Sequence, residues 1–174
     1  MILPIADDSE PILREISQPL NPEDMSSSQT KELVENMIQT MYAAKGIGLA
    51  APQIRILKRI IVFYLPATRD DVNGVGVPLT VLINPNMTVL DDSTVIDFEG
   101  CLSVPGKRGR VTRYKKIKYS GFDTDGQFIE REAIGWHARL FQHEFDHLNG
   151  ILYPEIMSKE DHLITFEEYA ALPK

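Results

Sequence analysis

The stretch His143-Glu144-Phe145-Asp146-His147 constrains this chain more than any other. It lies within residues 136–148, where the spacing of apolar side chains predicts a helix. Histidines four positions apart lie on one helix face, so both rings can reach one ion. Glu144 points about 100° away from His143, where it can act on water without binding the ion. Two ligands and a general base in this spacing are typical of metal-dependent hydrolases.

The rest of this helix indicates burial on two sides. Its apolar residues fall on opposite faces: Trp136 and Leu140 with the histidines, and Phe141, Phe145 and Leu148 across from them. A narrow polar strip remains, formed by Arg139, Gln142, Asp146 and Asn149. Histidines that face an apolar interior are costly unless they are paired or ligated, which favours ligation over a chance match. Asn149-Gly150 predicts the end of the helix.

Composition narrows the classes of protein. The chain has 174 residues and a net charge of −7, which predicts one globular domain over residues 1–174 and argues against a nucleic-acid-binding surface. The basic residues in 110–122 are more simply a solvated sheet face. Residues 1–5 resemble neither a signal peptide nor a membrane span. The single cysteine excludes an internal disulfide and fits the reducing cytoplasm.

Periodic patterns predict the remaining elements. A helix should run from after Asp24 to about Ala44, with Asp24 and nearby serines as caps, Gly46 as its stop and its methionines in the core. The predicted strands cover residues 59–65, 79–83, 87–90, 94–98, 110–122 and 127–134. A break at Asn84-Pro85 should separate the second from the third, and a turn at 91–93 the third from the fourth. Residues 123–126 predict a hairpin, and residues 161–172 a short acidic helix.

Two histidines leave a metal ion short of ligands. Cys101, in Glu99-Gly100-Cys101-Leu102-Ser103, would complete the set and leave one position open. The alternative is Glu167 or Glu168, about twenty residues beyond His147, as in a zinc metallopeptidase. The glycines and alanines of residues 46–53 leave the backbone bare, which suits close approach of a ligand or simply a tight turn. Gln53 could donate to an oxyanion or cap a loop.

Three segments, residues 46–53, 99–103 and 142–150, together resemble the three signature motifs of the peptide deformylases. The segment Pro11-Ile12-Leu13-Arg14 and the pair Asn84-Pro85 fit as well, so the resemblance spans residues 4–157. It implies a compact α+β fold, in which antiparallel sheets wrap around a central helix that carries His143 and His147. It also implies removal of the formyl group from N-formylmethionyl nascent chains. The implied metal is Fe²⁺, which Ni²⁺, Co²⁺ or Zn²⁺ can replace.

The resemblance assigns roles to residues. Cys101, His143 and His147 would bind the metal, Glu144 would transfer protons, and the Gln53 side chain and Leu102 backbone N–H would stabilise the oxyanion. The substrate-binding residues would be Ile47, Gly48, Gly100, Arg108, Trp136 and Leu140. Of these, Ile47 and Gly48 would pair with an extended peptide. Trp136 fits a core position equally well.

The chain also departs from the family pattern. Ile54-Arg55 stands where many relatives have Ile-Gly, which should change a turn and leave the chemistry intact. Residues 67–78 resemble an insertion. Some relatives have a basic C-terminal helix that docks on the ribosome. The tail of this chain is acidic, so any transient association with the ribosome should use another contact. A third interpretation is that the protein is not an enzyme. In that case it would be a metal-dependent structural or binding module without turnover.

Overall fold

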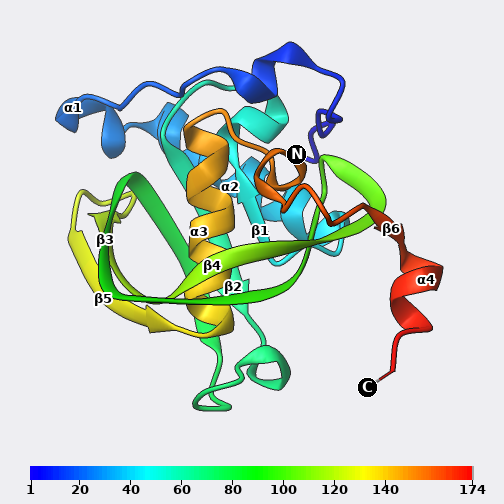
Figure 1. Ribbon diagram of the computed structural model, residues 1–174. Helices are drawn as coiled ribbons and strands as arrows, with labels where there is room; N and C mark the ends of the chain where they lie inside the picture. The colour runs from blue at the N-terminus through cyan, green and yellow to red at the C-terminus, as the bar shows by residue number, and fades with distance from the viewer. Residues whose placement is uncertain (174) are drawn as a thin grey trace.

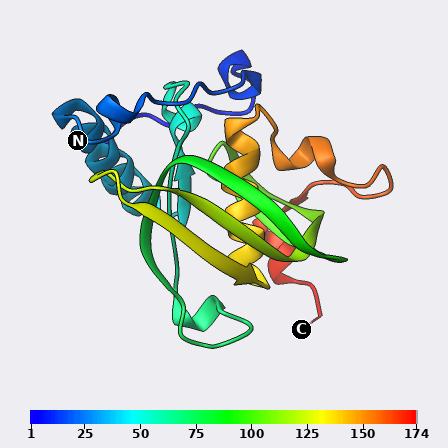
Figure 2. The same ribbon diagram turned by 90° about the vertical axis from the view of Figure 1, so that its left-hand side faces the viewer.

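A computed structural model describes residues 1–173 and places helix α3 (Trp136–Leu148) at the centre of the molecule. A curved antiparallel sheet wraps around this helix (Figures 1 and 2). The bounds of α3 match the predicted helix, and Gly150 takes the left-handed conformation that ends it, with φ of 71°. The α+β fold predicted from the sequence is confirmed.

The sheet follows the order of the chain. Its strands are β1 (Gly48–Ala50), β2 (Ile60–Leu65), β3 (Val77–Cys101), β4 (Val104–Phe122) and β5 (Phe128–Ile134), each antiparallel to its neighbour. The short strand β6 (Ile164–Thr165) pairs with β4 away from this path. The predicted hairpin at residues 123–126 joins β4 to β5, as expected.

Strand β3 is one strand of 25 residues, so the three separate strands predicted within it were wrong. Its pairing with β4 continues from Ile83↔Phe122 to Cys101↔Val104, with register shifts near residues 84–85 and 91–93. Asn84 has a φ of 50°, which places a kink there. The Asn-Pro pair and the Asp-Asp-Ser run therefore produce bulges, which bend a strand without ending it.

The helix predicted from after Asp24 to about Ala44 begins later, at Ser28, and a separate helical turn precedes it. Helix α1 (Pro22–Met25) is a single turn, and α2 (Ser28–Ala43) begins after Ser27, whose side chain accepts a hydrogen bond from the Thr30 backbone N–H. The predicted stop at Gly46 was wrong by one residue, because Lys45 takes the left-handed conformation with φ of 57°. Short 3-10 helices cover Pro11–Arg14, Ala51–Ile54, Ala67–Arg69 and Tyr153–Ile156.

Two apolar clusters hold these layers together. One lies between α3 and the sheet, where Phe141 stacks on Tyr119 at 4.4 Å between ring centroids. The other lies beneath α2, where Met37 and Met41 are fully buried, as the core interpretation of these methionines predicted. Each buried side chain of this size stabilises the fold by about 1.5–3 kcal/mol. The first cluster fixes Ala50 of β1 and the second half of β4, at Ile117 and Tyr119, against α3.

The C-terminal segment differs from the predicted helix over residues 161–172. It forms β6 and then the short helix α4 (Phe166–Ala170). Thr165 caps α4 by accepting a hydrogen bond from the Glu168 backbone N–H. No helix within residues 1–173 is long and apolar enough to cross a membrane.

Candidate metal centre

Three potential ligands converge where the end of β3 meets α3. Cys101 Sγ and His147 Nε2 lie 3.3 Å apart, and one donor atom from each of Cys101, His143 and His147 lies within 4.8 Å of the others. Such separations suit donors that each lie about 2.0–2.3 Å from a shared ion. Burial lowers the pKa of His147 well below its ordinary value, which keeps that ring neutral. The donor set therefore fits a single divalent metal ion.

Glu99 orients one of the two histidines. His143 Nδ1 hydrogen-bonds to Glu99 Oε1 at 2.8 Å, so the Nε2 atom is left for the donor cluster. Such a carboxylate partner fixes both the tautomer and the orientation of a ligating ring. Burial acts to raise the pKa of Glu99, but hydrogen bonds from Arg113 and His143 outweigh it and hold the pKa well below its usual range.

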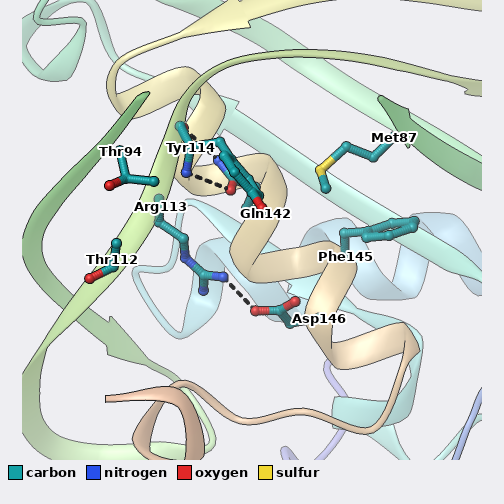
Figure 3. A pocket seen from close by; sticks show the side chains of 8 residues that line it. All are labelled: Met87, Thr94, Thr112, Arg113, Tyr114, Gln142, Phe145 and Asp146. Carbon is teal, nitrogen blue, oxygen red and sulfur yellow. Dashed lines mark hydrogen bonds and ion pairs between the residues drawn. The ribbon is translucent and has the colours of Figure 1, made fainter. Parts of the chain in front are cut away.

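Two buried arginines neutralise Glu99. Arg113 Nε and Nη2 bind its two carboxylate oxygens at 2.8 and 2.9 Å, and Arg139 Nη1 lies 2.7 Å from Oε2. Arg113 Nη1 also donates to Asp146 Oδ2 at 2.5 Å, as Figure 3 shows. A chain of hydrogen bonds and ion pairs thus runs from His143 through Glu99 and Arg113 to Asp146, beside a cavity of about 290 Å³.

The polar strip of α3 contributes Arg139 and Asp146 to this network and Gln142 beside it. Arg139 and Gln142 are almost completely buried beneath β3 and β4. Gln142 accepts a hydrogen bond from the Tyr114 backbone N–H and donates one to the Tyr114 carbonyl, again in Figure 3. The sheet therefore satisfies these side chains with its own charges and backbone groups, as burial requires.

Glu144 is buried against β1. A side chain at Gly48 would overlap its carboxylate, so the bare backbone at this position is required for the approach. Burial raises the pKa of Glu144 to about 7, with the nearby charge of His143 acting in the opposite direction. Its Oε2 atom is buried without a hydrogen-bond partner among residues 1–173. A buried carboxylate with this pKa has the properties of a general base near neutral pH.

Gln53 reaches the same centre from the 3-10 helix Ala51–Ile54. Its amide nitrogen lies 3.4 Å from Cys101 Sγ and 3.1 Å from Ser103 Oγ. Its carbonyl oxygen accepts a hydrogen bond from the Ala50 backbone N–H at 2.8 Å, which fixes the amide orientation. The sequence allowed two roles for Gln53, capping a loop or donating a hydrogen bond toward the site. In the structure its side chain makes contacts of both kinds.

A pocket of about 780 Å³ opens over the donor cluster. The sequence-predicted residues that line it are Ile47, Gly48, Gln53, Gly100, Cys101, Leu102, Arg108, Trp136, Leu140, His143 and Glu144. His147 is the one predicted site residue outside this lining, and its side chain is 1% exposed. Residues 68–71 and α4 also contribute to the walls. The structure thus brings the predicted site residues together.

The competing ligands Glu167 and Glu168 lie on α4 and are exposed. Glu168 Oε2 accepts a hydrogen bond from the Thr165 backbone N–H, and neither carboxylate joins the donor cluster. Sequence reasoning missed Glu99, Arg113 and Arg139. The one signal available was that Glu99 precedes the candidate ligand Cys101 by two positions, which places both side chains on the same side of a strand.

Comparison with known proteins identifies the family. The family model described as polypeptide deformylase matches residues 2–162. The chain belongs to this family. Peptide deformylase 2 of Pseudomonas syringae pv. tomato is 48% identical over 145 residues, which cover 83% of this chain and 80% of the relative. Peptide deformylase 1 of Bordetella pertussis is 44% identical over 154 residues, with 88% and 86% covered.

Solved structures of peptide deformylases have the same fold. The Met-Ala-Ser-bound enzyme of Acinetobacter baumannii superposes with a TM-score of 0.81 at 35% identity, over 90% of this chain and 99% of that one. The Thermotoga maritima peptide deformylase gives 0.79 at 37% identity, over 91% and 99%. As a deformylase, the chain is a hydrolase that removes N-terminal formyl groups. Membership of this family argues against the two alternatives, a zinc metallopeptidase and a binding module without turnover.

Proposed function

We propose that this chain hydrolyses the formyl group of N-formylmethionyl peptides, with Cys101, His143 and His147 as metal ligands and Glu144 as the base. The observation that carries the proposal is the convergence of one sulfur and two ring nitrogens within 4.8 Å. Glu144, a buried carboxylate whose pKa is raised to about 7, lies next to His143 on the same helix and lines the same pocket. Family membership supports the same reaction.

We propose Fe²⁺ as the ion in the cell, with Ni²⁺, Co²⁺ or Zn²⁺ able to replace it. One thiolate and two imidazoles suit all four ions. When bound, the ion supplies Lewis acidity, which lowers the pKa of water and polarises a carbonyl oxygen.

Residues of the chain then move protons and stabilise charge. Glu144 takes the proton from the attacking water and delivers it to the departing amine, a role that its pKa near neutrality supports. Negative charge grows on the formyl oxygen, where the Gln53 amide and the Leu102 backbone N–H would donate. The distance of 3.4 Å from the Gln53 amide nitrogen to Cys101 Sγ supports this role. Loss of one such donor is expected to reduce the rate by about 10²–10³.

The open edge of the sheet supports the mode of peptide binding. Within residues 1–173, β1 pairs only with β2, which leaves the other edge of β1 beside the pocket. An extended peptide could add there as a strand, with main-chain hydrogen bonds at Ile47 and Gly48 that are independent of side-chain identity. Trp136 and Leu140 would supply apolar surface for the methionine side chain, and Gly100 and Arg108 line the same pocket.

These features suit nascent chains of varied sequence as substrates in the cytoplasm. The Met-Ala-Ser ligand of the Acinetobacter baumannii relative supports a peptide in this pocket. Any contact with the ribosome would be transient and would not use a basic tail, because Glu167 and Glu168 are acidic.

The decisive experiment compares wild type with Glu144→Ala. Formyl-Met-Ala-Ser should release formate with wild type, whereas the variant should keep its metal and lose turnover, because only the proton carrier is removed. Metal content by elemental analysis and formate release are the measurements. Acetyl-Met-Ala-Ser should react far more slowly, because a methyl group crowds the attacked carbon. Full turnover by the variant, or equal rates for the two peptides, would contradict the proposal.

A further inference from the structure

The C-terminal helix α4 forms part of the wall of the catalytic pocket. Phe166 and Tyr169 line the same cavity as Cys101 and Glu144. Strand β6 holds the helix there by pairing with β4, with Lys107 opposite Thr165 and Arg108 opposite Ile164. Figure 1 shows β6 running beside β4 before the chain turns into α4. Strand β6 and helix α4 are therefore held against β4, the strand that follows Cys101 in the chain.

Arg108 joins α4 to the pocket. Its Cζ atom lies 4.4 Å from the centroid of the Phe166 ring and 6.0 Å from that of Tyr169. A side chain at Gly100 would overlap the Arg108 guanidinium, so this group lies directly against the backbone next to Cys101. Within residues 1–173, Arg108 forms no ion pair with a carboxylate. Aromatic rings, rather than charges, hold this guanidinium at the rim.

The two aromatic residues keep large exposed surfaces. Phe166 is 50% exposed and Tyr169 is 42% exposed, although Tyr169 also packs edge-on against Phe98 with ring centroids 5.2 Å apart. Exposed aromatic surface beside a pocket gives binding energy to an apolar side chain that covers it. The pocket continues from the metal centre to this wall, so a peptide held at the centre would supply the covering group.

We propose that Phe166 and Tyr169 form a specificity subsite for an aromatic side chain in the first residues after the formylmethionine. This inference rests on the proposed function and adds a preference to it. The ring of the peptide would stack on the aromatic wall of α4, and Arg108 would hold that wall in place through its contact with Phe166. The acidic tail would thus act in substrate selection.

The test uses the full chain loaded with metal and four amidated peptides: formyl-Met-Ala-Ala, formyl-Met-Phe-Ala, formyl-Met-Ala-Phe and formyl-Met-Ala-Lys. One of the two phenylalanine peptides should show kcat/KM about 2- to 10-fold above the alanine peptide, through a lower KM, as expected for one aromatic contact. Phe166→Ala and Tyr169→Ala should remove this preference, so that the ratio of kcat/KM for the preferred phenylalanine peptide to kcat/KM for formyl-Met-Ala-Ala falls to about 1. Tyr169→Phe should retain it.

Phe128→Ala is the matched control, because Phe128 is a 61% exposed aromatic on β5 that packs on Phe122 away from the pocket. It should keep the full preference. Equal losses on every peptide in the α4 variants would indicate a purely structural role and overturn the inference. An equal gain with the lysine peptide would assign the preference to Glu167 and Glu168 instead. If no peptide releases formate even with wild type, the proposed function itself fails.

Discussion

At the scale of single residues, Glu99 links the candidate metal ligand His143 to the buried arginines of the interior. Its carboxylate contacts His143, Arg113 and Arg139, and all three partners are themselves buried. Removing one partner from such a group leaves buried charges without compensation, which costs far more than losing a surface ion pair. Glu99 should therefore influence both the stability of the fold and the affinity for metal.

We expect Glu99→Gln to weaken metal binding by about 10- to 100-fold, because the amide cannot hold the His143 tautomer as a carboxylate does. The free energy of unfolding should fall by about 3–5 kcal/mol, since Arg113 and Arg139 lose their shared counter-charge. Competition with a chelator and urea denaturation measure the two effects.

Glu130→Gln serves as the control, because Glu130 is an exposed carboxylate on β5 that pairs with Lys118 at 3.6 Å. Its effect on stability should stay within about 0.5 kcal/mol. Wild-type metal affinity in Glu99→Gln would show that Glu99 does not orient the ligand.

At the scale of elements, the end of α2 strains the chain. Lys45 follows the helix with φ of 57°, a conformation that costs most residues with a side chain about 1–2 kcal/mol. Its side chain is exposed, so little packing offsets this cost. Glycine is the residue that usually occupies this position after a helix.

Lys45→Gly should therefore stabilise the protein by about 0.5–1 kcal/mol, after allowing for the extra freedom of glycine in the unfolded chain. For a protein of this size, Tm should rise by about 2–4 °C per kcal/mol. Thermal unfolding of Lys45→Gly and Lys45→Ala separates the backbone effect from loss of the charge, because alanine keeps the strain. Equal Tm values for the two variants would refute the strain argument.

The elements also differ in how far the sequence predicts them. Helix α3 was predicted to the residue, because its apolar periodicity and the Asn149-Gly150 stop are local signals. Strand β3 was divided wrongly, since Asn84-Pro85 looks the same in sequence whether it ends a strand or kinks one. Pairing with β4 decides between these outcomes, and that partner lies more than thirty residues away in the chain.

The same limit applies to the candidate site. The ligand candidates Cys101, His143 and His147 could be predicted, because each lies in a short motif with its own chemical logic. Glu99 and Arg113 could not, because their roles arise from contacts between β3, β4 and α3. The sequence pattern of one helix or strand indicates which of its residues lie on the same side. It does not indicate which charged residues of other elements will contact them.

At the scale of the whole molecule, the partly buried His137 should make the free energy of unfolding depend on pH. His137 lies beneath the sheet beside Tyr119, and burial lowers its pKa from 6.5 to about 4. The unfolded chain therefore takes up this proton first as the pH falls. The contribution is complete above about pH 6.5 and is lost progressively between pH 6.5 and 4.

We expect His137→Gln to lose less stability than wild type between pH 7 and pH 5, because glutamine can keep a hydrogen bond to Tyr119 without titrating. Urea denaturation at the two pH values measures the difference. The same substitution at His162, which is exposed, should reproduce the wild-type dependence. Parallel losses in wild type and His137→Gln would show that other groups dominate acid sensitivity.

The partly exposed Cys101 is the only cysteine of the chain, and its sulfur belongs to the proposed ligand set. Alkylation with iodoacetamide would therefore modify one atom per molecule, and a bound ion would protect that atom. The fraction of chains that gain the mass of the label would count vacant centres directly. A preparation could thus be graded by mass spectrometry before any assay of turnover.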